Sequence, residues 1–125
     1  MSKLTYKEEI KDIFTVSDAY YFAQCISADF AMGKGIAVLF NQNFDVKNQL
    51  TARYGNWLDR WDTVEEERGT CILEGRVYNL ITKRNYWNKP TYKTMYNSLK
   101  AMADMVKSNP DVGKIAMPMI GCGLD

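Results

Sequence analysis

Two short segments of the chain contain paired glycines, the residue type that lets a phosphate group approach bare backbone. The first segment is Met32–Phe40 and the second is Met119–Asp125, and each carries two glycines separated by one residue. Free backbone N–H groups in such loops bind anions. One glycine pair is more often a simple turn, but two pairs that each follow an apolar strand predict a diphosphate held from both sides.

Acid–base chemistry in this chain depends on few residue types, because the sequence contains no histidine. The residue types that can still donate or accept a proton in catalysis are Asp, Glu, Lys, Tyr and Cys. Lys83 ends an apolar run and Asp125 ends the second glycine segment, so these two side chains are the candidate base and acid. The three cysteines have no zinc-like spacing and favour neither a metal site nor a disulfide framework. We therefore expect no metal and no cofactor.

Length and composition predict one globular domain over residues 1–125. The 125 residues are 46% hydrophobic with 3 prolines, which suits a single core without a linker. The net charge of +1 provides no overall attraction to nucleic acid or to an anionic membrane. The charged N-terminus lacks an apolar signal core, and no apolar run reaches the roughly twenty residues of a membrane span. We expect a monomeric, intracellular protein without membrane contact, cytoplasmic or, in a eukaryote, also nuclear.

The elements around the first glycine segment are predicted from apolar spacing. Residues 19–26 form an almost unbroken apolar run, which is typical of a strand buried on both faces in a parallel sheet. Ser27 and Asp29 follow, and we expect them to hold the loop through side-chain to backbone hydrogen bonds. After Gly35, helical spacing of apolar residues predicts a helix over 36–44. Strand, glycine loop and helix in this order are typical of phosphate-binding units in α/β folds.

The rest of the chain alternates between predicted helices and strands. Asp45 is expected to cap a second helix that ends at Gly55, and residues 56–69 are interpreted as a surface insertion with a solvated acidic run. A hairpin is predicted around Glu74–Gly75. Further predictions are an edge strand within residues 3–14, strands over 70–73, 76–82 and 114–118, and a helix whose core stripe is Tyr92, Met95, Leu99, Met102 and Val106.

Three separated motifs in a fixed order carry a resemblance to a known family. The motifs are Cys25–Ser27 followed by Met32–Phe40, then Leu80–Lys83 with Lys89–Tyr92, and finally Met117–Asp125. With them the sequence resembles the macro domains, in particular the branch that contains the terminal ADP-ribose protein glycohydrolase and bacterial DNA ADP-ribosylglycohydrolase antitoxins. The resemblance spans nearly the whole chain and implies an α/β fold, a three-layer αβα sandwich with a mixed central sheet. Relatives continue past the aspartate matched by Asp125, so the last helix and strand of that fold are expected to be absent.

The resemblance also implies an ADP-ribose site in a cleft, with the diphosphate between the two glycine segments. Asp12 and Ile13 match the family's pair at the adenine end, although Lys11 stands where the family has glycine, and Ser27 matches a residue near the ligand. The implied catalytic residues are Lys83, which would attack the anomeric carbon of the distal ribose, and Asp125, which would handle the protons. The implied substrate-binding residues are Asp12, Ile13, Ser27, Gly33, Gly35, Ile36, Ala37, Met119, Ile120, Gly121, Cys122, Gly123 and Leu124.

The function implied by the resemblance is hydrolysis of terminal ADP-ribose from acidic side chains of proteins or from nucleic acid. Lys83 can act as a nucleophile only when it is unprotonated, and we expect burial and the neighbouring Arg84 to disfavour its charged form. Three alternatives stay open. They are an ADP-ribose 1″-phosphate phosphatase, a reader that binds ADP-ribose without turnover, and a single-strand binding protein that uses the loop over 83–92.

Overall fold

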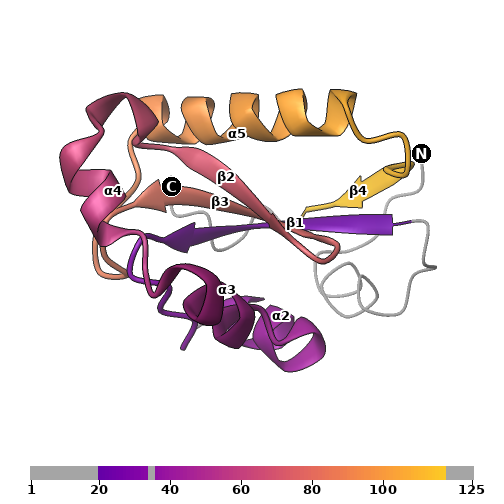
Figure 1. Cartoon of the computed structure of the whole chain (residues 1–125), viewed down its shortest axis with the longest axis horizontal. Helices are drawn as coiled ribbons and strands as arrows, with labels where there is room; N and C mark the ends of the chain where they lie inside the picture. Colours follow the sequence, from indigo (N-terminus) through magenta and orange to yellow (C-terminus); the bar gives the residue numbers. More distant parts are fainter. Residues whose placement is uncertain (1–19, 34–35, 118–125) are drawn as a thin grey trace.

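The strands of the computed structural model form one sheet, and helices lie on both of its faces (Figure 1). The structure describes residues 20–33 and 36–117, so the predicted edge strand within residues 3–14 lies outside the described part. The strands are β1 (Tyr20–Ser27), β2 (Thr70–Glu74), β3 (Val77–Lys83) and β4 (Lys114–Ala116). The helices are α2 (Ile36–Phe44), α3 (Val46–Tyr54), α4 (Leu58–Thr63), the short 3₁₀ helix η2 (Glu65–Glu67) and α5 (Tyr92–Lys107).

The sheet is mixed, with the strand order β2-β3-β1-β4. β1 pairs in parallel with β3 and with β4, whereas β2 pairs antiparallel with β3. β1 therefore lies between two parallel neighbours, and its residues Phe22, Ala23 and Ile26 are buried. Strands covered on both faces read as continuous apolar runs. The predicted strand and its parallel pairing are thus confirmed, with each end displaced by one residue.

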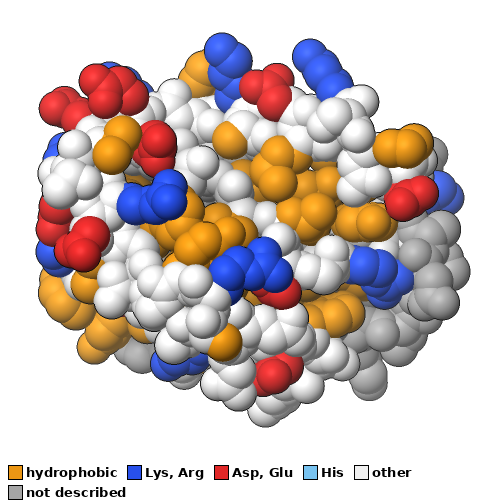
Figure 2. All heavy atoms as spheres, in the orientation of Figure 1, with side chains coloured by type: hydrophobic (Ala, Val, Ile, Leu, Met, Phe, Trp, Pro, Cys, Tyr) orange, Lys and Arg blue, Asp and Glu red, His pale blue; other side chains and the backbone are white. Residues whose placement is uncertain are grey.

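Two clusters of apolar side chains fill the two faces of the sheet. On the face covered by α2 and α3, Phe22 packs with Phe40 and Leu50. On the face covered by α5, Leu80 packs with Leu99. Helices on both faces give the three layers that the sequence predicts. Figure 2 shows hydrophobic side chains gathered across the middle of this face, with cationic and acidic side chains scattered around them.

Two glycines end elements where the sequence places them. Gly75 has a φ of 60° in the turn between β2 and β3, so the predicted hairpin is confirmed. Gly55 has a φ of 74° after α3, and its N–H donates to the carbonyl of Thr51 at 2.7 Å. Glycine adopts these left-handed conformations without a Cβ penalty.

Asp45 stands at the N-cap position of α3, as the sequence predicts, but the expected capping by its side chain is wrong. Asp45 has a φ of 54°, and its side chain makes no capping hydrogen bond to α3. Instead, the backbone N–H of Lys47 donates to the side-chain oxygen of Asn41 at 2.9 Å. With its backbone in the left-handed conformation, Asp45 uses its carboxylate to accept a hydrogen bond of 2.8 Å from the side-chain amide of Asn48. Sequence alone cannot reveal a backbone conformation that redirects a capping side chain.

Two further interpretations need correction. Residues 56–69 are not simply a surface insertion, because they contain α4 and the buried side chain of Trp57. The acidic run within η2 is exposed, as predicted. Tyr92 does not belong to the core stripe of α5, since it is 79% exposed at the first turn of the helix, while Met95 is buried. Helical spacing assigns a residue to a face but does not show how far the sheet extends beneath that face.

The cysteines differ from one another in state. Cys25 of β1 is disulfide-bonded, although the number and spacing of the cysteines do not favour a disulfide framework. Cys71 of β2 has a free thiol, and burial raises its pKa to about 12. Within residues 20–33 and 36–117, no helix has both the length and the apolar character needed to cross a membrane.

Candidate functional site

The carboxyl ends of β1 and β3 bring two predicted site residues together. Ser27 of β1 is the register partner of Lys83 of β3. The preceding pair is Ile26 with Ile81, so Thr82 is an extra residue in β3 and forms a bulge. Beyond the strands, the N–H of Ala28 donates to the carbonyl of Lys83 at 2.8 Å. Bulges re-aim side chains and are frequent next to active sites, and ligands of open α/β sheets bind at the carboxyl ends of the strands.

Asp29 connects the segments that leave these two strands. Its carboxylate accepts hydrogen bonds from the Ser27 hydroxyl and from the N–H of Ala31 at 3.1 Å, both on the β1 side. The other carboxylate oxygen accepts from the N–H of Tyr86 at 3.1 Å, on the β3 side. Partial burial of Asp29 would raise the pKa of its carboxyl, but these hydrogen bonds and one from the side chain of Asn85 lower it below the usual value. Asp29 is therefore held as a carboxylate.

Lys83 is half-buried at this edge, and its burial lowers the pKa of its ammonium below the ordinary 10.5. The carboxylate of Asp29 acts in the opposite direction and raises that pKa. The direction of the net effect increases the fraction of neutral amine, which is the form that can act as a base or a nucleophile. Lys83 thus has one of the properties that a catalytic lysine needs.

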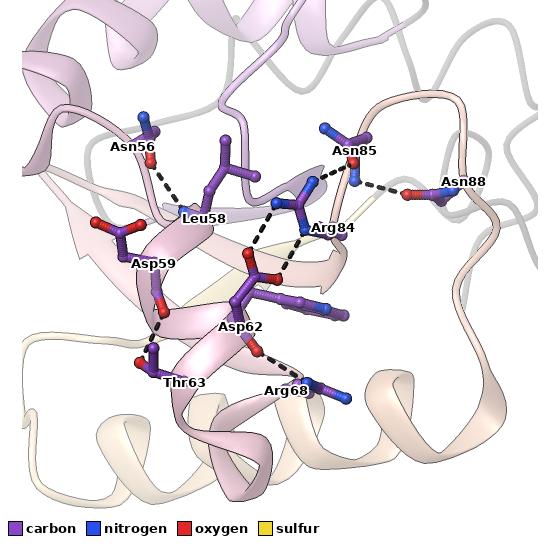
Figure 3. A network of polar contacts seen from close by, with 10 residues as sticks. Asn56, Leu58, Asp59, Asp62, Thr63, Arg68, Arg84, Asn85 and Asn88 are labelled. Atoms are coloured by element: carbon purple, nitrogen blue, oxygen red, sulfur yellow. Dashed lines mark hydrogen bonds and ion pairs between the residues drawn. The ribbon is translucent and has the colours of Figure 1, made fainter.

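Arg84 does not have the effect on Lys83 that its position in the sequence suggests. Its guanidinium makes two hydrogen bonds of 2.8 Å to the two carboxylate oxygens of Asp62 on α4, and a third of 2.9 Å to Asn85 (Figure 3). This bidentate pair compensates its charge. Burial, and not Arg84, lowers the pKa of Lys83.

A surface depression of about 270 Å³ lies beside Lys83, where β3 leads into α5. Its walls carry three cations and three threonines, and α4 contributes one indole. Cations and hydroxyl groups at the start of a long helix are suited to an anion. The lining residues are Trp61, Thr82, Lys83, Arg84, Asn88, Lys89, Thr91 and Thr94.

The described part of the first glycine segment leaves its backbone open. Gly33 is exposed, and a Cβ added to it would meet nothing within 4 Å. The φ of Gly33 is not positive, so its backbone conformation does not require a glycine. α2 begins three residues later at Ile36, and Ala37 packs half-buried against the first core cluster. The backbone N–H groups of a first helical turn have no partner within the helix.

Ten predicted site residues lie outside the described part of the chain, and their roles stay predictions. They are Asp12, Ile13, Gly35, Met119, Ile120, Gly121, Cys122, Gly123, Leu124 and Asp125. Among the described residues, no three side chains of His, Cys, Asp or Glu are grouped so that they could hold a metal ion.

The sequence identifies part of the role of Asp29. The prediction that it holds its own loop is confirmed by the bond from Ala31, whereas the Ser27 hydroxyl binds the Asp29 side chain and not the backbone. The contact to Tyr86 spans 57 positions and was not predicted. No local pattern signals a contact over that separation. Lys89 and Thr91 belonged to a recognised motif, but only the structure gathers them with Lys83 around one depression.

The overall arrangement is that of a macro domain. The macrodomain of Mycobacterium tuberculosis DarG superposes with a TM-score of 0.65 at 16% sequence identity, over 91% of this chain and 77% of that one. At this identity the likeness concerns the fold alone. No family model matches the sequence.

Sequence similarity defines the group more closely. The chain is 37% identical over 125 residues to ADP-ribose glycohydrolase OARD1 of Homo sapiens, and 36% identical to the same protein of Bos taurus. Each alignment covers 99% of this chain and 75% of the relative. The chain belongs to the macro domain family, in the group related to OARD1.

Proposed function

We propose that this protein binds conjugates of ADP-ribose and hydrolyses the bond that links a terminal ADP-ribose to its acceptor. The observation that carries the proposal is the half-buried Lys83, with a lowered pKa, at the carboxyl edge of a sheet whose neighbouring loop exposes Gly33. The similarity to a protein named as an ADP-ribose glycohydrolase supports the class of reaction. A lysine in this state is suited to attack a sugar carbon.

The proposed reaction begins on neutral Lys83. Its Nζ lone pair forms a bond to C1″ of the distal ribose while the bond from C1″ to the acceptor oxygen breaks, so that an ester acceptor leaves as a carboxylate. The nitrogen loses a proton to give a glycosylamine, whose ring opens to an imine as a proton moves to the ring oxygen. Water adds to C1″ of the imine, a proton returns to the nitrogen, and the bond from Nζ to C1″ breaks, which releases neutral Lys83 and ADP-ribose. Asp125 is proposed to carry these protons.

The proposed binding mode follows the glycine segments. Gly33, with Gly35 and the first turn of α2 from Ile36 and Ala37, would present backbone N–H groups to the diphosphate from one side. The segment from Met119 to Leu124 would do so from the other. Ser27 would lie near the distal ribose because it pairs with Lys83. Asp12 and Ile13 are proposed to receive the adenine.

A nucleic acid is a second candidate for the acceptor, beside an acidic side chain. The loop after Lys83 exposes Tyr86 by 54% and Trp87 by 67%, and Lys89 lines the adjacent depression. Exposed aromatic rings stack on bases, and cations near them meet phosphates. This combination favours an ADP-ribosylated strand over a plain acidic peptide.

The test compares three substrates at equal concentration: an ADP-ribosylated acidic peptide, ADP-ribosylated single-stranded DNA, and ADP-ribose 1″-phosphate. Release of ADP-ribose from either of the first two, measured by mass spectrometry, is the expected result, with the Lys83→Arg variant as the inactive control. Cleavage of the phosphate alone would replace the proposal with the phosphatase alternative. Binding of ADP-ribose without release from any substrate would replace it with a reader.

A further inference from the structure

Asp29 is the one described carboxylate that contacts both loops of the candidate site. On the β1 side it accepts from the N–H of Ala31, two residues before Gly33. On the β3 side it accepts from the N–H of Tyr86, three residues after Lys83. The Ser27 hydroxyl adds a third donor from the end of β1 itself. One side chain therefore fixes the distance between the start of the glycine segment and the loop that follows Lys83.

The surroundings of Asp29 favour the ionised form of its carboxyl group. The residue is half-buried, and a buried carboxylate is stable only if donors satisfy it. Backbone donors from two different segments do so here, together with Ser27 and Asn85. Hydrogen bonds to an ionised acceptor are roughly twice as strong as neutral ones. The two backbone N–H groups donate to different oxygens of the carboxylate, and asparagine would place an NH₂ donor at one of these two positions.

We propose that Asp29 is a positioning residue, which holds the glycine segment and the Lys83 loop at the separation that an ADP-ribose conjugate needs. The inference rests on the proposed function of this site. Asp29 acts through two backbone segments and not by touching the substrate. It has a second effect that can be measured separately, because its negative charge acts on the ammonium of Lys83.

The first test is the Asp29→Asn variant with Asp62→Asn as its matched control. Both changes remove one negative charge and keep the shape of the side chain. Asp62 also binds the loop after β3, through Arg84, but within the described ranges 20–33 and 36–117 its side chain makes no hydrogen bond to the β1 side. We expect Asp29→Asn to weaken ADP-ribose binding in calorimetry by about ten- to a hundredfold, and Asp62→Asn to leave it nearly unchanged. Equal affinities for Asp29→Asn and the wild type would overturn the proposal, as would equal losses in both variants.

A second pair of variants covers the case in which Asp29→Asn does not fold. Tyr86 is the second residue of the turn that is closed by the bond from the N–H of Asn88 to the carbonyl of Asn85, at 3.0 Å. Proline fits this position of a turn and lacks an N–H. Tyr86→Pro should therefore remove the donor to Asp29 and weaken binding, whereas Tyr86→Ala keeps the donor and should bind more tightly than Tyr86→Pro. The reverse order, or no difference, would refute the role of the contact.

A third measurement separates this inference from the proposed function. If wild-type protein binds no ADP-ribose, the proposed function fails, and the titration of Lys83 by ¹³C NMR still reports on Asp29. Among the residues that the structure describes, the charged side chains around Lys83 are Asp29, Arg84 and Lys89, with Asp62 engaged by Arg84. Asp29→Asn should lower the pKa of Lys83 further, and Asp62→Asn should not. An unchanged titration in Asp29→Asn would mean that Asp29 does not act on the candidate nucleophile.

Discussion

Ser27 faces Lys83 across the ladder of β1 and β3, although a regular register would pair Ser27 with Thr82. The extra residue in β3 shifts Lys83 by one position. Because successive side chains of a strand point to opposite faces, a shift of one residue changes the face on which a side chain lies. The bulge at Thr82 therefore places opposite Ser27 the one described side chain that we propose as a nucleophile.

The Lys83→Arg variant separates an enzyme from a reader. Arginine keeps the positive charge but does not deprotonate at accessible pH. We expect the variant to bind ADP-ribose in calorimetry with an affinity close to that of the wild type, and to release none from a conjugate. Borohydride added during turnover should attach the mass of ADP-ribose to Lys83 in the wild type alone. Full activity of Lys83→Arg would exclude a covalent role for the lysine.

The rate of hydrolysis should depend on the protonation of Lys83. Its folded pKa lies below 10.5, so the neutral amine becomes available as pH rises through that lowered value and is lost as pH falls below it. We expect single-turnover rates to increase with pH and to level off before pH 10.5. A rate that is independent of pH on the acid side would contradict a lysine nucleophile.

Gly33→Val tests whether the first glycine segment contacts the ligand. The added side chain meets nothing within 4 Å and the φ of Gly33 is not positive, so the free energy of unfolding should change by less than about 0.5 kcal/mol. Valine would nevertheless fill the space next to the exposed backbone, and ADP-ribose affinity should fall. Urea denaturation and calorimetry on the same samples check both parts. Normal binding would show that the segment is only a turn.

Gly69→Ala is expected to destabilise the fold where the residue packs against α5. Gly69 has a φ of 89°, and a Cβ there would overlap the carbonyl oxygen of Thr94 on α5. The strained conformation alone costs roughly 1 to 3 kcal/mol. Gly55→Ala is the control, because its φ of 74° is also positive but its surroundings are open. The loss of unfolding free energy in urea should be larger at Gly69 than at Gly55.

Cys71 should resist alkylation in the folded protein. With a pKa of about 12, only roughly one thiol in ten thousand is ionised at pH 8. Iodoacetamide should therefore label the Cys71 peptide slowly under native conditions and rapidly in urea, as mass spectrometry of digested samples can measure. Rapid native labelling would show that β2 opens frequently.

The sequence predicts elements whose cause is local and misses contacts whose cause is not. The apolar run of β1 and the glycine of the β2–β3 hairpin are local signals, and both predictions are confirmed. Tyr92 was misplaced because helical spacing does not show where the sheet ends. The bulge at Thr82 and the contact from Asp29 to Tyr86 depend on how two distant strands align. The candidate nucleophile could therefore be named from sequence, but its orientation and its neighbours could not.

The pairing of β1 with β3 also has a consequence during synthesis of the protein. A chain that has left the ribosome only as far as α4 contains Ser27 and Gly33 but no Lys83, and β1 has neither of its parallel neighbours. Contacts over such separations form late, since a long loop must close first. A ligand that binds only the finished sheet stabilises the native state by mass action. ADP-ribose should therefore protect the 125-residue chain against proteolysis and leave a nascent fragment unprotected.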